Sequence, residues 1–181
     1  MRTQKTLVAT VVFFLLVSLP LASAIPPSGG ETSTITTSET WTDDGSMDGH
    51  VVVANGATLT VNANITMAKD ATITVEEGAQ LVVTNGALVS EDLNAGVMVN
   101  GIGATLKLNF GDLADDGVVQ IMFDHTIGDA KFNVSLGNET INASGTNIVQ
   151  FDAPLNGTEL VVMFDSLYFQ PTYVLWAKAI Y

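Results

Sequence analysis

The segment Val51-Val-Val-Ala-Asn-Gly-Ala-Thr-Leu-Thr-Val61 returns 22 residues later as Ile73-Thr-Val-Glu-Glu-Gly-Ala-Gln-Leu-Val-Val83. Five of the eleven aligned positions are identical, and the positions expected to face a core are aliphatic in both copies. A looser third copy begins at Val97, where Gly78 corresponds to Gly101 or Gly103. Repeats of this length are typical of solenoids, in which one short unit stacks on the next because it cannot bury its apolar face alone.

Within each copy, threonine alternates with aliphatic residues, as in Thr58-Leu-Thr-Val61, which is the period of a half-buried strand. Three short strands in a coil of about 22 residues predict an all-β fold built on a parallel β-helix. The alternative is a set of hairpins with glycine turns, whose composition imitates a repeat. The predicted core consists of Val51, Val53, Leu59, Val61, Ile73, Val75, Leu81 and Val83, with Gly56 and Gly78 at the turns.

These repeats also carry a resemblance. The phrases Gly56-Ala-Thr-Leu-Thr-Val61, Asp70-Ala-Thr-Ile-Thr-Val75 and Glu77-Gly-Ala-Gln-Leu-Val-Val83 resemble the coils of secreted parallel β-helix surface proteins and adhesins of prokaryotes. The resemblance extends from Val51 to Val99 and slightly beyond. It implies an elongated extracellular scaffold and brings no catalytic residue with it.

Residues 1–24 are predicted to form a secretory signal peptide. Arg2 and Lys5 precede an apolar run, and Ala22-Ser-Ala24 provides small residues for cleavage. The run is short for a bilayer span of roughly 20 residues, although an uncleaved anchor is the alternative. No membrane span is expected once the leader is removed, so we expect the protein to be secreted or displayed on the cell surface.

The rest of the chain divides into three predicted regions. Residues 25–42, rich in threonine and serine, are expected to be a linker or arm, or a loosely paired first strand. Residues 43–108 are expected to hold the coils. Residues 109–181 carry further strand patterns and bulky aromatic residues, which predict a β-rich cap or sandwich. The final strand ends without a polar tail, so we expect that it could pair with another subunit.

Composition excludes several classes of function. The 181 residues include six Lys and Arg against 19 Asp and Glu, a formal charge of −13. Without the leader, four lysines remain against 19 acids, a charge of −15 with no arginine. Such a chain repels phosphate backbones, so no nucleic-acid partner is expected. With no cysteine, it forms no disulfides, thiolate-bound metal sites or thiol nucleophiles.

We expect no enzyme activity. His50 and His125 are the only histidines, and the sequence contains no Gly-x-Ser-x-Gly elbow for a nucleophilic serine. Adjacent acids such as Glu76 and Glu77 occur in several turns, but they do not by themselves create the sugar cleft that glycosidases need.

No cofactor is expected, although calcium is possible. Asp44, Ser46 and Asp48 offer oxygen ligands at the first, third and fifth positions of a calcium-loop pattern, and Gly49 stands at the sixth. The match is incomplete, because Asn55 stands where a bidentate glutamate belongs. A solvated acidic loop is the alternative explanation.

The Asn-x-Ser/Thr pattern of N-glycosylation occurs at five positions, Asn64, Asn133, Asn138, Asn142 and Asn156. The last four are clustered, which suits a glycosylated surface protein.

The sequence thus predicts an exported, non-catalytic structural or adhesive protein of the cell surface or extracellular space. Its expected partners are other surface proteins, glycans or copies of itself. One alternative is a pilus or fibre subunit that exchanges strands with its neighbour, using the N-terminal arm or the final strand. Another is a carbohydrate-binding module, whose stacking faces would come from Trp41, Trp176, Tyr168 and Tyr173.

Overall fold

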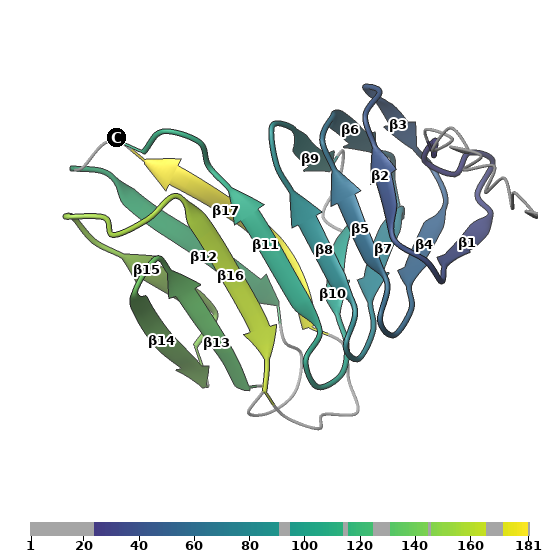
Figure 1. Cartoon of the computed structure of the whole chain (residues 1–181). Helices are drawn as coiled ribbons and strands as arrows, with labels where there is room; N and C mark the ends of the chain where they lie inside the picture. The colour runs from purple at the N-terminus through teal and green to yellow at the C-terminus, as the bar shows by residue number, and fades with distance from the viewer. Residues whose placement is uncertain are drawn as a thin grey trace, which may run out of the picture.

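The structure is a computed structural model, which describes residues 24–90, 95–113, 116–124, 131–144, 146–165 and 172–180. Every regular element in these ranges is a β-strand, and the strands form three sheets (Figure 1). We call them sheet A, with order β1-β4-β7-β10-β17-β12-β15, sheet B, with order β14-β13-β16-β11-β8-β5-β2, and sheet C, with order β3-β6-β9.

The N-terminal half is a parallel β-helix of about three turns, which confirms the predicted fold class. Each turn contributes one strand to each sheet, and a fourth turn begins in sheets A and B alone. The strands are β1 (Thr32–Ile35), β2 (Glu39–Trp41), β3 (Gly45–Met47), β4 (His50–Val53), β5 (Thr58–Val61), β6 (Asn64–Met67), β7 (Thr72–Val75), β8 (Gln80–Val83), β9 (Ala87–Ser90), β10 (Gly96–Val99) and β11 (Thr105–Asn109).

The repeat seen in the sequence is the stacking register of two successive coils. Val51 pairs with Ile73 and Leu59 pairs with Leu81, so each residue lies beside its counterpart 22 positions on. The next coil is looser, and Gly103 lies against Gly78 there, which decides between the two glycines that the sequence left open.

The coils begin earlier than the boundary at residue 43 that the sequence suggested. β1 pairs in parallel with β4, and β2 pairs in parallel with β5, so the threonine-rich segment 25–42 builds most of the first coil. Ile35 and Trp41 are the physical reason, because both point into the core and are 4% and 1% exposed. Two well-placed apolar side chains are enough to anchor an otherwise polar run.

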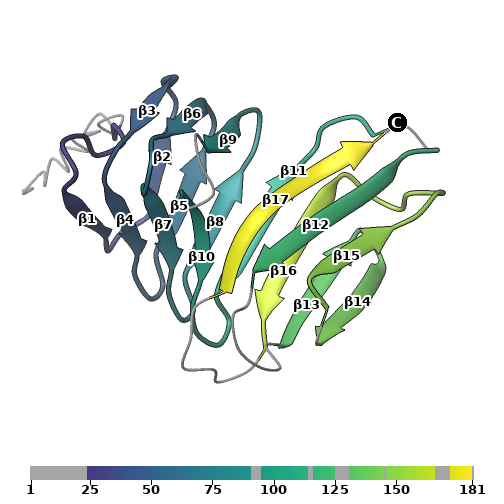
Figure 2. The ribbon, with the colours of Figure 1, turned by 180° about the vertical axis from the view of Figure 1, so that it is seen from behind.

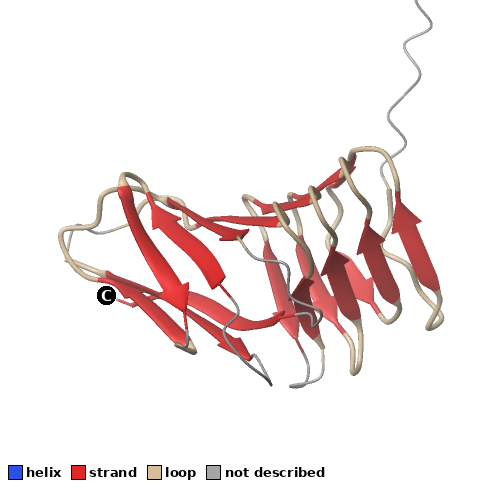
Figure 3. Ribbon diagram, turned by 90° about the horizontal axis from the view of Figure 1, so that it is seen from below, coloured by secondary structure: helices blue, strands red, loops and turns tan. Residues whose placement is uncertain are grey.

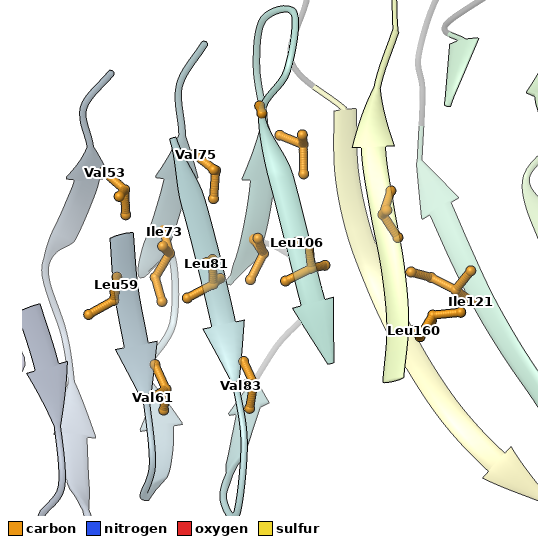
Figure 4. Packing of buried hydrophobic residues seen from close by; sticks show 14 of the residues in the cluster. Val53, Leu59, Val61, Ile73, Val75, Leu81, Val83, Leu106, Ile121 and Leu160 are labelled. Atoms are coloured by element: carbon orange, nitrogen blue, oxygen red, sulfur yellow. The ribbon is translucent and has the colours of Figure 1, made fainter. Parts of the chain in front are cut away.

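The eight aliphatic residues predicted to form the solenoid core are all buried, and most of them are labelled in Figure 4. The aliphatic side chains of the three sheets point into the coils and pack together there. The threonines between them in β5 and β7 face outward. Gly56 and Gly78 adopt positive φ angles of 78° and 67°, which glycine accepts without a steric cost. Each fully buried aliphatic side chain contributes roughly 1.5–3 kcal/mol to folding.

The C-terminal half is an antiparallel sandwich that extends sheets A and B (Figures 1 and 3). Its strands are β12 (Val118–Asp124), β13 (Lys131–Leu136), β14 (Glu139–Ser144), β15 (Ile148–Phe151), β16 (Glu159–Phe164) and β17 (Thr172–Ile180). β16 pairs with β11 of the fourth coil, and β17 pairs with β10. The predicted sandwich is therefore joined to the solenoid by continuous hydrogen bonding.

Phenylalanine fills the space between the two layers of the sandwich. The rings of Phe123 and Phe132 stack with centroids 4.9 Å apart, and Phe164 meets Phe132 edge-on at 5.2 Å. These rings belong to the same buried cluster as the valines and leucines of the coils. Both halves therefore share one hydrophobic core.

The final strand is built into sheet A, where it pairs with two strands of its own chain. β17 lies between β10 and β12 and is antiparallel to both, as Figure 2 shows. Val174, Ala177 and Ala179 pack against the shared core. β10 pairs with Thr172, Tyr173 and Val174 at the start of β17, whereas β12 pairs with nearly the whole strand.

Candidate functional site

Sheet C contains three strands and stops at the third coil, whereas sheets A and B continue into the fourth. Sheets A and B pass through the fourth coil as β10 and β11, but sheet C stops at β9. Among the described residues, no strand lies beside β9 on the side away from β6. As far as the described residues go, the third side of the fourth coil is therefore open.

A cleft of about 510 Å³ occupies this opening. Its walls come from β9, from β10 and β17 of sheet A, and from β11 of sheet B, and its described lining carries no charged side chain. The opening changes the burial of the strand beside it. Leu88 is half-buried, whereas Ile65, the residue paired with it in the preceding coil, is completely buried.

The main chain of β9 faces this cleft with one of its edges. Ala87 donates its backbone N–H to the carbonyl of Ala63, at 3.1 Å, on the side of β6. Successive residues of a strand direct their N–H and C=O groups to opposite edges, so Leu88 directs both of its groups away from β6. The site thus combines an apolar cleft with a main-chain donor and acceptor.

The three predicted calcium ligands are not brought together. Ser46 lies on the extended strand β3, and Asp44 and Asp48 flank the two ends of that strand. At about 3.3 Å per residue, an extended β3 separates the backbones of Asp44 and Asp48 by several residue lengths, whereas a calcium ion binds its oxygen ligands at about 2.3–2.6 Å. Within the described ranges, no group of three or more His, Asp or Glu side chains could hold a metal ion.

Each of the two carboxylates accepts hydrogen bonds from a neighbouring segment of the chain. Asp44 accepts the backbone N–H of Asn64 at 2.7 Å and the side-chain amide of Asn64 at 3.4 Å. The backbone hydrogen bond, helped by the side-chain one, lowers the pKa of the Asp44 carboxyl. Asp48 accepts the backbone N–H of Gly30 at 3.4 Å.

The predicted glycosylation sites lie on strands and turns of both halves. Asn64, Asn138, Asn142 and Asn156 are exposed, and Asn133 is half-buried. Asn133 and Asn142 are cross-strand partners, and the amide of Asn142 donates to the side-chain oxygen of Asn133 at 3.2 Å. Four of the five asparagines are therefore accessible, which is what a modified site needs.

The aromatic residues proposed for sugar stacking do not form one platform. Trp41 is 1% exposed inside the first coil, so it cannot meet a sugar. Trp176 is half-buried, and the ammonium group of Lys178 lies 4.3 Å from its ring centroid. Tyr173 lies near the start of β17, while Tyr168 is outside the described residues.

The histidines occupy no shared site that the structure describes. His50 is exposed, and its Nδ1 lies 2.9 Å from the hydroxyl of Thr72 in the next coil. His125 falls outside the described residues, as does nearly all of the predicted leader. The described part of the chain contains no helix of the length and apolar character that a membrane crossing requires.

The cleft beside β9 was not predicted, although the sequence carries a signal for it. The third strand of a coil, Asn64–Met67 or Ala87–Ser90, has no counterpart after Asn109, where Phe110-Gly-Asp follows instead. A missing third strand in the last coil predicts an open side. Comparisons of the chain with protein-family models, with curated proteins and with solved structures return no match.

Proposed function

We propose that this protein is an exported, non-catalytic structural and adhesive module of the cell surface or extracellular space. The observation that supports it most is the continuity of sheets A and B, which run from the first coil through the sandwich over one buried core. Such a body has no flexible joint between its halves. A rigid spacer of this kind suits a protein that holds a binding surface at a distance from its attachment point.

Two further features agree with this proposal. The outer faces of the coils carry rows of threonine, such as Thr40 beside Thr60, which keep the exposed sheet polar. The accessible asparagines of the glycosylation pattern gather mainly at the sandwich end, at Asn138, Asn142 and Asn156. Acidic, hydrated surfaces of this kind keep edge-rich β proteins soluble.

The test is to locate the protein in the organism that produces it. Intact cells are treated with a protease that cannot enter them, and the surviving protein is detected with an antibody against the solenoid. We expect the protein to be degraded from outside or recovered from the medium, and a variant lacking residues 1–24 to stay protected inside. Protection of the full-length chain in intact cells would contradict the proposal.

Adhesion requires its own measurement. Deleting the gene is expected to reduce cell–cell aggregation or attachment to a surface, and adding the purified protein is expected to restore it or to compete with it. Unchanged aggregation and attachment in the deletion strain would remove the adhesive part of the proposal while leaving the structural part.

A further inference from the structure

We propose that the cleft beside β9 is an acceptor site for one extended strand of a partner protein, which would complete sheet C at the level of the fourth coil. This inference rests on the proposed surface function and deepens it, because it names the class of partner. Its support comes from the main chain of β9, the lining of the cleft and the charge of the molecule.

The main-chain groups of β9 favour a polypeptide as the occupant of the cleft. Leu88 directs one N–H and one C=O toward the open side, where the described residues provide no neighbouring strand. A hydrocarbon chain would leave these groups without partners, at the cost that an unmade hydrogen bond carries in an apolar setting. An extended peptide supplies an acceptor and a donor at the matching spacing, as in strand addition to an exposed sheet edge.

The apolar lining of the cleft indicates which side chains the partner strand would carry. Met67 and Leu106 are buried in the core of the coils, Val174 of β17 packs against that core, and all three line the cleft. β6 shows what fills the equivalent place one coil earlier, because Ile65 and Met67 point inward on either side of an outward threonine. We therefore expect the partner strand to place aliphatic residues at alternate positions, with polar residues between them.

The charge of the molecule argues against a second copy as the donor. The chain carries a formal charge of −13, and its lining offers no lysine to offset the repulsion between copies. A partner whose strand is flanked by basic residues is favoured over one flanked by acids.

The experiment measures binding of fluorescent synthetic peptides to the isolated protein. The main peptide carries the Ile-Thr-Met core of β6 between flanking lysines, and a second one carries glutamates in place of those lysines. Two N-methylated versions of the first peptide block the amides of one edge or of the other. We expect the lysine peptide to bind, the glutamate peptide to bind at least several-fold more weakly, and only one of the methylated peptides to lose binding.

Two variants of the protein place the peptide in the cleft. Leu88→Pro removes the outward N–H, a change that an edge strand tolerates, and Leu175→Glu places a charge in the lining at a half-buried position. Each is expected to weaken binding by about tenfold, the effect of losing roughly one main-chain hydrogen bond or its apolar equivalent. Val82→Glu is the matched control, because Val82 lies on the outer face opposite Lys107 and away from the cleft.

The outcomes separate this inference from the proposed function. Absence of peptide binding at millimolar concentration, or binding that neither Leu88→Pro nor Leu175→Glu weakens, would overturn the acceptor site. Equal binding of the glutamate peptide, or self-association that Leu175→Glu abolishes, would overturn the assignment to a basic foreign partner. None of these results changes where the protein is found in the cell, so the location experiment tests the surface function independently.

Discussion

The solenoid and the sandwich bury the same kind of core by different means. In the solenoid, each strand pairs with the corresponding strand of the next coil, and the core consists mainly of aliphatic residues repeated along the chain. In the sandwich, strands far apart in the sequence pair antiparallel, and the core is dominated by Phe123, Phe132, Phe151 and Phe164. A repeat therefore builds a stack step by step, whereas ending the stack requires pairing between strands that are far apart in the sequence.

The two halves meet at the fourth coil, where the difference has a structural consequence. Sheets A and B accept antiparallel strands there, from β17 and β16, and continue into the sandwich. Sheet C receives no such strand among the described residues, and a cleft remains at its edge. Two of the three sides of the stack are closed by the chain itself, and the third is the side that we propose a partner completes.

The largest expected effect comes from a charge in the solenoid core. Leu81→Asp loses roughly 1.5–3 kcal/mol of apolar burial and adds a penalty of several kcal/mol for an unpaired buried carboxylate. Together these approach the whole stability of a typical domain, about 5–15 kcal/mol. We expect the variant to lack a cooperative melting transition in circular dichroism.

Val82→Asp is the control for that variant. Val82 is the next residue on β8, but it faces outward across from Lys107, so the aspartate remains hydrated. We expect near wild-type melting. Equal damage from both variants would contradict the inward and outward alternation of the strand.

A second prediction tests whether the two halves unfold together. Phe132→Ala in the sandwich should cost about 3–5 kcal/mol, as for other buried phenylalanines replaced by alanine. Because the core is continuous, we expect the midpoint of unfolding to fall in the solenoid as well. Trp41, buried in the first coil, reports on that half by fluorescence when Trp176 is replaced by phenylalanine. An unchanged Trp41 midpoint would show that the halves unfold independently.

A third prediction concerns the corner between β8 and β9. A Cβ atom on Gly86 would lie against the backbone of Ala63 in the coil below, at 2.2 Å from its carbonyl oxygen. Gly86→Ala should therefore force neighbouring coils apart and destabilise the protein by about 1–3 kcal/mol, the usual cost of overpacking. Gly45→Ala is the matched control, because nothing lies within 4 Å of that position. Chemical denaturation of both variants measures the difference.

The smallest expected effect is a change in the acid sensitivity of the first coils. Hydrogen bonds from Asn64 lower the pKa of Asp44 in the folded protein, so the folded state holds this proton less tightly than the unfolded chain does. The stabilisation is fully present above the unfolded pKa, about 3.9, and is lost as the pH falls through the lower folded value. Asp44→Ala should lower the melting temperature slightly at neutral pH and lose this difference in strong acid.

Glu77→Ala serves as the comparison, because Glu77 is an exposed acid in a turn of the same half. We expect its melting temperature to follow the wild-type profile. If Asp44→Ala and Glu77→Ala show the same dependence on pH, the bond between Asp44 and Asn64 does not stabilise the first coils.

The parts of the fold that the sequence predicted are those governed by neighbouring coils. Leu59 and Leu81 could be assigned to the core because their alternation and their repeat gave the same answer. The first coil was missed because Ile35 and Trp41 stand in a threonine-rich run whose composition resembles a linker. The strand patterns of residues 109–181 predicted a β-rich cap or sandwich, but patterns do not show which distant strands pair.

The candidate site was predictable only in its individual residues. The asparagines of the glycosylation pattern can be found from the sequence, whereas the separation of Asp44 from Asp48 depends on β3 being extended. The cleft depends on four strands meeting around a place where a fifth is missing. The sequence signals only that no third-strand segment follows Asn109, and it does not show which strands surround the opening.

The sequence by itself determined a parallel β-helix, because a repeated alternation of threonine and aliphatic residues buries one face only when copies stack in register. The tertiary structure alone decided how the stack ends. β17, far along the chain, pairs with β10 and closes one side, while no strand of the described residues covers the outer edge of β9. Which edges are covered is a matter of long-range pairing, and the free energy of that pairing depends on the whole core rather than on any one segment.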